Sequence, residues 1–394
     1  MLPVTNSSSR PACAEAQAGP LRVHLVGSAR LGVAAPDADL DLVCVHAEAP
    51  QGAPAAVAAA LTRRGPLRAR TVQSAGVIAL RGEFAGIDFD LLFARAPAPL
   101  VARDPADLRA ADLVPLDEPS RRALLGCVDA DALVRLAGPD ADAFRGALAR
   151  VRRWTRARAL EGGAWGLLGG YTWAVLVAAC AHEAVQEPVH QDRSRRPAPL
   201  DPWTLCRRFF TTFAAWPSAR PVLPGPPPPA PEARRAPWPI YTPTPPTFNS
   251  ARGLTPTTLA LLQRELRRAA AIVAAEADEP RALAELCAPP VPDADLRLEL
   301  TVRAADPDAL AAAQGLVDGR ALGLLLALEA AGAALRPLGW EGARARVDLR
   351  GGDPAELRAL VDAAVTEWQR AAAWPAPATI AALLAPVYPA CEPP

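Results

Sequence analysis

Lysine is absent from this chain of 394 residues, so arginine carries all of its basic side-chain charge. Lys+Arg and Asp+Glu each total 42, and without a basic excess the composition alone does not indicate a polyanionic partner. The seven cysteines include no CxxC pair, which argues against a structural zinc site and indicates a reduced compartment. The four histidines show no ligand spacing, so we assign them no chemistry.

Long apolar segments are also scarce. The first twenty residues are polar and contain Pro and Ser, which predicts a disordered tail over residues 1–20 and no secretory signal. Residues 164–181 carry no charge over 18 positions, which reaches the length of a membrane span. Because this stretch holds several glycines and a threonine, we favour a buried helix and expect no membrane partner.

The most informative segment combines a strand, a turn and a second strand. Val23–Val26 is a short apolar run typical of a buried strand, and Gly27 and Ser28 end it at a turn whose amides and hydroxyl can face a triphosphate. Ten residues later, Asp39 and Asp41 stand at the start of another apolar strand. Side chains two apart on a strand point to the same side, so both carboxylates are expected to project into one space.

Two neighbouring aspartates repel each other unless a cation lies between them, and oxygen ligands suit Mg²⁺. The segment 84–95 supplies a third carboxylate, because Asp88 and Asp90 alternate with apolar residues on what reads as an adjacent strand. A lone Asp-x-Asp is usually a turn or a solvated strand end, but this ordered set is more specific. It predicts nucleotidyl transfer, and the alternative is a sheet protein with acidic strand ends.

The same residues resemble a known family. GSARLGVAAPDADLDLVCV followed by GIDFDLLFAR is similar to the catalytic core of the eukaryotic-type poly(A) polymerases, in the DNA polymerase beta-like nucleotidyltransferase superfamily. Residues 148–178 resemble, without gaps, the family's middle-domain helices, with Trp154 in one motif and Gly169 to Trp173 in another. Weaker similarities follow at 124–133, at 238–250 and from residue 295 onward.

The resemblance implies two-metal phosphoryl transfer. Asp39 and Asp41 would bridge two Mg²⁺ or Mn²⁺ ions, and Asp90 would hold the ion that activates the primer 3′-hydroxyl. Asp88 would only support these ligands, since the family usually has glutamate there. The protein need not form a covalent intermediate, because phosphoryl transfer is catalysed mainly by positioning the reactants and stabilising charge in the transition state.

The resemblance also implies a nucleotide-binding set. The Gly27 amide and Ser28 would contact the outer phosphates, and Gly170 and Tyr171 would lie at the nucleotide. Arg152 takes the place of the family's triphosphate-binding lysine, and a guanidinium can hold phosphate bidentately. The alternative for Arg152 is a solvated charge on a helix that carries several arginines.

Three positions depart from the family pattern. Gly76 replaces a phenylalanine, Leu125 an asparagine and Glu161 a tyrosine, and all three of those side chains contact the nucleotide in the relatives. We therefore expect an intact metal site with weakened base selectivity.

The resemblance implies a template-independent polynucleotide adenylyltransferase that adds AMP from ATP to RNA 3′ ends and releases pyrophosphate. A terminal uridylyl- or mixed-nucleotide transferase is one alternative, and an inactive RNA-binding pseudo-enzyme is another. ATP and an RNA 3′ end are the expected partners, and 3′-processing factors are further candidate partners. The protein is expected to be a monomer. The nucleus is the compartment that the resemblance implies, with the cytoplasm as the alternative.

The expected fold class is α+β, with a nucleotidyltransferase mixed-sheet domain, a helical middle domain and a ferredoxin-like or RRM-like C-terminal domain. Periodicity predicts helices at 53–63, 120–136, 139–158, 167–183, 202–215, 257–276, 308–335 and 354–374, and strands at 296–303 and 343–349. The expected domains are a catalytic domain at 21–104, a middle domain at 105–288 whose proline-rich insertion 217–246 crosses the surface, an RNA-binding domain at 289–375, and tails at 1–20 and 376–394.

Overall fold

The fold is taken from a computed structural model of the chain. It describes residues 21–35, 38–47, 52–74, 76–138, 141–186, 200–224, 237–245, 247–371 and 378–387. The expected tail over residues 1–20 lies outside this range.

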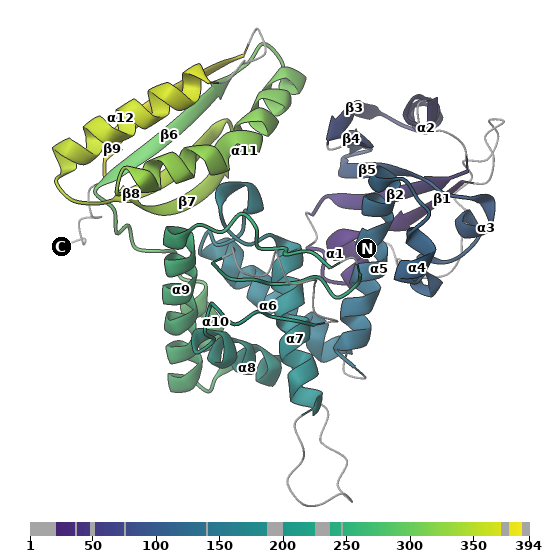
Figure 1. Ribbon diagram of the computed structural model, residues 1–394, viewed down its shortest axis with the longest axis horizontal. Helices are drawn as coiled ribbons and strands as arrows, with labels where there is room; N and C mark the ends of the chain where they lie inside the picture. The colour runs from purple at the N-terminus through teal and green to yellow at the C-terminus, as the bar shows by residue number, and fades with distance from the viewer. Residues whose placement is uncertain are drawn as a thin grey trace, which may run out of the picture. The chain divides into compact units, whose positions relative to one another are not determined.

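The chain forms two compact units (Figure 1). The first comprises Met1–Val134 and Thr244–Pro246, and the second comprises Arg135–Pro243 and Thr247–Pro394. Most of the long helix α5 (Glu118–Leu136), which the sequence assigns to the middle domain, thus belongs with the N-terminal sheet. An ion pair between Arg30 and Asp131 ties this helix to that unit.

A five-stranded mixed sheet forms the centre of the first unit, in the order β1-β2-β5-β4-β3. Only the β2–β5 pair is parallel. The strands are β1 (Leu21–Leu25), β2 (Leu40–His46), β3 (Leu67–Ser74), β4 (Val77–Phe84) and β5 (Ile87–Arg95). The helices are α1 (Gly27–Leu31), α2 (Ala53–Thr62), α3 (Ala98–Val101), α4 (Ala110–Leu113) and α5, with a 3-10 turn η2 (Pro105–Asp107).

One face of this sheet is an apolar core. Cys44, Phe89, Leu91 and Phe93 are buried there, and Val57 of α2 packs against them. Because side chains alternate along a strand, the residues between these core positions point to the opposite face. Alternation therefore places Asp41 and Asp90 away from α2.

The helical part of the second unit has an aromatic core. Trp154 and Trp173 meet edge to face with ring centroids 5.6 Å apart, and Phe210 lies 5.0 Å from Trp154. The uncharged stretch 164–181 owes its composition to this core, because most of helix α7 is fully buried. The elements are α6 (Ala141–Ala157), η3 (Gly163–Trp165), α7 (Gly170–Gln186), α8 (Pro202–Ala214), α9 (Pro256–Ala275) and α10 (Glu279–Leu286).

The proline-rich segment corrects one expectation. It does not simply cross the surface, because Trp238 and Tyr241 are only 2% and 1% exposed. Val222 and Ile240 pair in a short parallel bridge, which gives the buried backbone hydrogen-bond partners. Residues 225–236 and 246 lie outside the described part of the chain.

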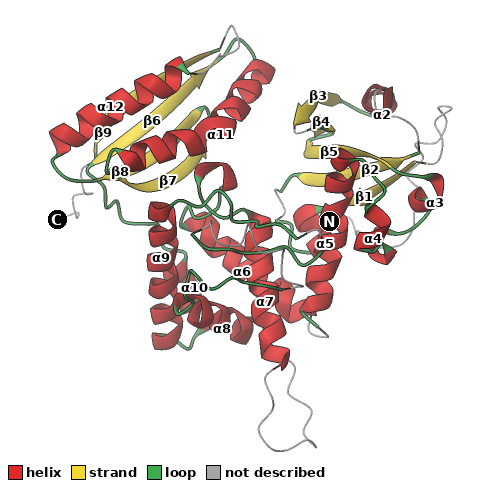
Figure 2. Cartoon of the chain, in the orientation of Figure 1, coloured by secondary structure: helices red, strands yellow, loops and turns green. Residues whose placement is uncertain are grey.

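A four-stranded antiparallel sheet completes the second unit, in the order β7-β8-β6-β9, and α11 and α12 lie together on one of its faces (Figure 2). The elements are β6 (Leu296–Arg303), α11 (Pro307–Ala330), β7 (Ala334–Glu341), β8 (Arg344–Arg350), α12 (Pro354–Arg370) and β9 (Thr379–Pro386). The expected tail at 376–394 is wrong where β9 pairs with β6. The sequence signal failed there because the segment lacks regular alternation.

Helix α11 is the one described helix that is long and apolar enough to cross a membrane by length and composition. Its buried side chains include Val317, Leu324, Leu325 and Leu328, which belong to the core of the C-terminal sheet. The sequence extends this helix to residue 335, but it ends at Ala330 and β7 begins at Ala334.

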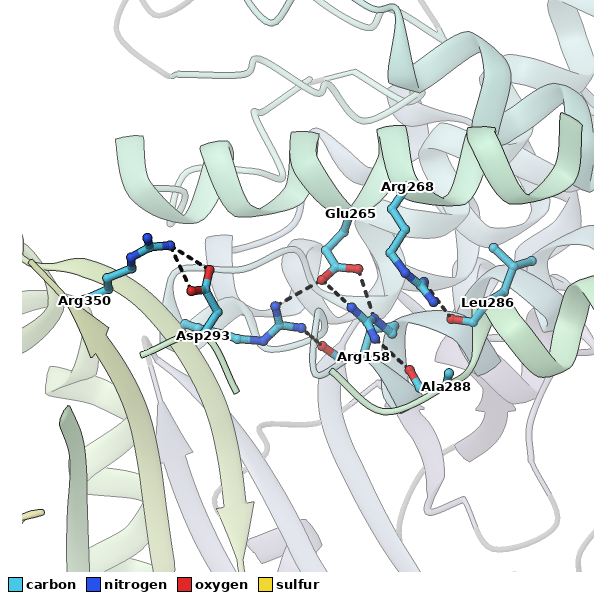
Figure 3. A network of polar contacts seen from close by, with 8 residues as sticks. Arg158, Glu265, Arg268, Leu286, Ala288, Asp293 and Arg350 are labelled. Atoms are coloured by element: carbon cyan, nitrogen blue, oxygen red, sulfur yellow. Dashed lines mark hydrogen bonds and ion pairs between the residues drawn. The ribbon is translucent and has the colours of Figure 1, made fainter. Parts of the chain in front are cut away.

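A buried ionic network joins the helical part of the second unit to its sheet (Figure 3). Glu265 of α9 is 3% exposed and accepts two hydrogen bonds from Arg158, at 2.9 and 2.8 Å. Arg336 of β7 donates a third, at 3.0 Å, and also bonds the carbonyl of Arg158. Burial alone would raise the pKa of Glu265, but its hydrogen bonds and the charges of both arginines hold that pKa below its ordinary value. This network fixes the sheet to α9.

Candidate active site

Two of the three predicted carboxylates lie side by side in the first unit. Asp41 on β2 and Asp90 on β5 are direct partners in the parallel register, so their side chains share one face of the sheet. Asp39 is exposed and lies one residue before β2. Asp88 is exposed on β5, on the same face as Asp90 by alternation.

Arg81 of β4 contacts Asp90 from the other side. The two residues are direct partners in the antiparallel β4–β5 register, and Arg81 Nε donates to Asp90 Oδ2 at 3.0 Å. The second carboxylate oxygen, Oδ1, is buried and has no hydrogen-bond partner. A buried carboxylate oxygen without a donor is a suitable ligand for a hard cation. Arg81 therefore neutralises one oxygen of Asp90 and leaves the other without a hydrogen-bond partner.

Within the described residues, no three His, Cys, Asp or Glu side chains already form a metal-binding group. Arg81 holds Oδ2 of Asp90, so Oδ1 is the oxygen of this carboxylate that has no hydrogen-bond partner. The donor set itself, carboxylate oxygens from two adjacent strands, fits Mg²⁺ or Mn²⁺.

Gly27 is packed directly against Asp41. A Cβ built at Gly27 would overlap Asp41 Oδ2 and would lie 3.1 Å from Asp41 Cγ. The residue also has φ +57°, a region that favours glycine. The amide of Val26 donates to the Asp41 carbonyl at 3.0 Å, so the end of β1 and the start of β2 are held together. Glycine at this position gives the Asp41 carboxylate its place.

The predicted Gly-Ser turn is the start of the short helix α1, and Ser28 lies in its first turn, half-buried. Arg30 anchors this helix. Its guanidinium bonds both carboxylate oxygens of Asp131, at 2.9 and 2.6 Å, and the carbonyl of Leu25 at 3.2 Å. The Gly-Ser segment is therefore positioned by side chains from α5 as well as by the sheet.

In the second unit, Arg152 of α6 forms an ion pair with Glu161 at 2.9 Å. Gly170 begins α7 directly beside this pair, and Tyr171 follows it. The structure thus brings together Arg152, Gly170 and the departure Glu161.

Residues 5–137 match the family described as the poly(A) polymerase nucleotidyltransferase domain. The N-terminal part of this chain is thus similar to that domain. It combines the family's Gly-Ser segment with the paired carboxylates on β2 and β5.

Two curated relatives show the extent of the similarity. Poly(A) polymerase PAPalpha of Candida albicans is 30% identical over 273 residues, which cover 64% of this chain and 45% of the relative. Nuclear poly(A) polymerase 4 of Arabidopsis thaliana is 29% identical over 205 residues, which cover 51% of this chain and 26% of the relative. The chain therefore spans less than half the length of these relatives.

Solved structures are similar at low identity. A cytoplasmic RNA terminal U-transferase has a TM-score of 0.47 at 13% identity, covering 69% of this chain and 86% of that chain. The Cid1 poly(U) polymerase with MgGTP has a TM-score of 0.48 at 14% identity, covering 68% and 87%.

Two of the departures from the family pattern, Gly76 and Leu125, have local structural roles. Gly76 has φ +83° in the β3–β4 turn, and an added Cβ would lie 2.9 Å from Pro119. Leu125 is 7% exposed in α5. A glycine is thus required by the turn, and a leucine fills space in the core.

Sequence reasoning missed Arg81 in the first unit. Ala85 and Gly86 form the tight turn between β4 and β5, both with positive φ. A two-residue hairpin turn fixes the register, and this register places residue 81 opposite residue 90. The Ala-Gly dipeptide between two alternating runs was the signal that could have identified the pair.

Proposed function

We propose that this protein is a template-independent polynucleotide adenylyltransferase that adds AMP from ATP to RNA 3′ ends. The observation that carries the proposal is the register that places Asp41 beside Asp90 on the face of the sheet opposite α2, next to a Gly-Ser segment. The names of the two curated relatives, both poly(A) polymerases, support adenylyl transfer.

In this proposal Asp39, Asp41 and Asp90 hold two divalent ions, which supply Lewis acidity to the reacting oxygens. The protein's own residues orient the groups. Gly27 leaves room for the Asp41 carboxylate. The Gly27 amide and Ser28 contact the outer phosphates. The primer hydroxyl attacks the α-phosphate and pyrophosphate leaves in line.

Terminal uridylyl or mixed-nucleotide transfer is the second candidate. The departures at Gly76, Leu125 and Glu161 favour it, because they remove three of the base contacts that the family resemblance implies. Glycine and leucine at the first two positions present no polar side chain to a base. The proposal is therefore ATP as the preferred nucleotide, with measurable use of others.

The four-stranded sheet of the second unit, with α11 and α12, is proposed to contact RNA, because its βαββαβ order is that of RRM-like domains. On the face away from the helices, Arg297 pairs with Asp348 at 2.6 Å and Arg346 pairs with Glu299 at 3.0 Å. The one aromatic residue on these described strands, Trp340, bonds Asp318. Contact with RNA would accordingly rely on arginine and phosphate rather than on base stacking.

The domains proposed for these roles are 21–104 for catalysis, to which most of α5 is added, the remainder of 105–288 for the helical middle, and 289–375 together with β9 for RNA contact. We also propose a nuclear location, because one relative is named as a nuclear enzyme.

The test is extension of labelled oligo(A) by the purified protein with each nucleotide in turn, with Mg²⁺ or Mn²⁺. We expect ATP incorporation that is abolished by Asp41→Ala or Asp90→Ala, with an unchanged circular dichroism spectrum. Asp88→Ala is the matched control, because it removes an exposed carboxylate from the same strand and should be milder. Near-normal extension by either of the first two variants would refute the metal assignment. Preferred incorporation of UTP would replace adenylyl with uridylyl transfer.

A further inference from the structure

Glu161 holds Arg152, the arginine that the family resemblance assigns to the triphosphate. Glu161 Oε1 lies 2.9 Å from Arg152 Nη2, and the two side chains are only 20% and 16% exposed. The other carboxylate oxygen lies 3.3 Å from Thr155 Oγ1 and 3.9 Å from Arg156 Nε. Both oxygens of Glu161 are thus engaged from helix α6.

The Glu161 carboxylate also lies against the first residue of α7. A Cβ added at Gly170 would be 2.6 Å from Glu161 Oε1 and 3.0 Å from Arg152 Nη2. The Trp173 amide donates to the Gly169 carbonyl at 3.2 Å, which makes Gly169 the residue that precedes the first turn. The positive end of a helix favours an anion. Glycine at position 170 leaves the space that the ion pair fills.

The Nε side of the guanidinium is closed to an anion. Arg152 Nε is buried and has no hydrogen-bond partner, so solvent cannot reach that edge. Nη2 is the group that Glu161 holds. A phosphate that approaches Nη2 meets a carboxylate already in contact with it, and two anions on one donor repel each other.

We propose that Glu161 is an internal anion that occupies Arg152 and that the triphosphate of the incoming nucleotide must displace. The inference deepens the proposed function and rests on it for the use of a nucleoside triphosphate, while the role of Arg152 comes from the family resemblance. Glu161 raises the dissociation constant of the triphosphate, and it can return to Arg152 when pyrophosphate leaves. A polyanion with several charges competes with one carboxylate better than a monoanion does.

The test is binding of inorganic tripolyphosphate to the full chain by calorimetry at low ionic strength. Glu161→Gln keeps the shape of the side chain and removes its charge, so we expect binding to tighten by roughly three- to tenfold. Arg152→Gln should weaken binding, and the double variant should bind like Arg152→Gln alone. Glu161→Asp, which withdraws the carboxylate by one methylene, should give an intermediate constant and serves if the glutamine variant does not fold.

Glu279→Gln is the matched control. Glu279 accepts a hydrogen bond from Arg150 on the same helix at 2.7 Å, so this variant also removes a carboxylate from an arginine of α6. We expect no change in tripolyphosphate binding there. If both variants bind tripolyphosphate more tightly by the same factor, the change in net charge alone explains the result, and the proposal is overturned.

Unchanged or weaker binding by Glu161→Gln would also overturn it. Failure of the proposed function is recognised separately, in the RNA extension assay of the native protein. Tighter tripolyphosphate binding without extension would refute adenylyl transfer and keep the role of Glu161. Extension with unchanged binding would refute the role of Glu161 alone.

Discussion

Replacing Gly27 with alanine tests whether backbone packing sets the catalytic carboxylate. The new methyl group would overlap Asp41 Oδ2, so either the carboxylate or the backbone must move. Two effects are expected. Alanine at φ +57° costs roughly 1 to 2 kcal/mol of stability, because its Cβ is strained in the left-handed region. The overlap additionally shifts the carboxylate.

The two effects differ in size and in what they change. A displacement of roughly 1 Å in a catalytic group typically lowers the rate about 100-fold. The strain alone would lower the melting temperature by a few degrees and leave the rate of the folded protein unchanged. We therefore expect Gly27→Ala to lose about two decades of kcat with a modest change in thermal stability.

Gly86→Ala supplies the matched control. Gly86 has φ +83°, so alanine meets the same kind of backbone strain, but an added Cβ there has no atom within 4 Å. The assay is single-turnover extension of oligo(A) for both variants, beside thermal unfolding. Similar extension rates for the two variants would refute the reasoning that Gly27 positions Asp41.

Two further predictions concern ion pairs. Arg81→Gln should tighten Mn²⁺ binding in a spectroscopic titration, because Arg81 neutralises Asp90. The expected change is only roughly two- to fivefold, since the Arg81 side chain is 56% exposed and solvent screens its charge. Weaker binding would show that Arg81 instead orients Asp90 for the ion. Glu265→Gln should lower the free energy of unfolding by about 3 to 5 kcal/mol, since it leaves the buried Arg158 and Arg336 without a counter-charge. The pKa of Glu265 is lowered, so its contribution is present above pH 4.5, the ordinary value, and is lost as the pH falls further. Urea unfolding of native and variant protein should therefore differ less at acid pH, and a constant difference would contradict this account.

Local patterns were enough to predict many elements of this fold. Strand β6 was predicted with its bounds, Leu296–Arg303, because alternation is a property of neighbouring residues. Helix α2 was predicted to within one residue for the same kind of reason. Alternation also placed Asp88 and Asp90 on one face of their strand, which needs no knowledge of the strand's neighbours.

Strand β9 and the proline-rich segment could not be predicted in this way. Thr379–Pro386 is a strand because β6, far away in the sequence, supplies its hydrogen-bond partners. Trp238 and Tyr241 are buried because the second unit packs over them, although a run of prolines normally indicates a surface segment. Both outcomes depend on which remote segment pairs with or covers the chain.

For the site, the sequence by itself determined the chemistry that is present: the carboxylates, the Gly-Ser segment and the arginine of α6. Only the tertiary structure decided their partners. Register placed Asp41 beside Asp90, a second register placed Arg81 on Asp90, and the turn before α7 brought Glu161 to Arg152. The alternation of residue types along a strand can be read from a few neighbouring positions. The partner of each side chain depends instead on strand register and on where the chain turns, and the energies that set these are summed over many contacts.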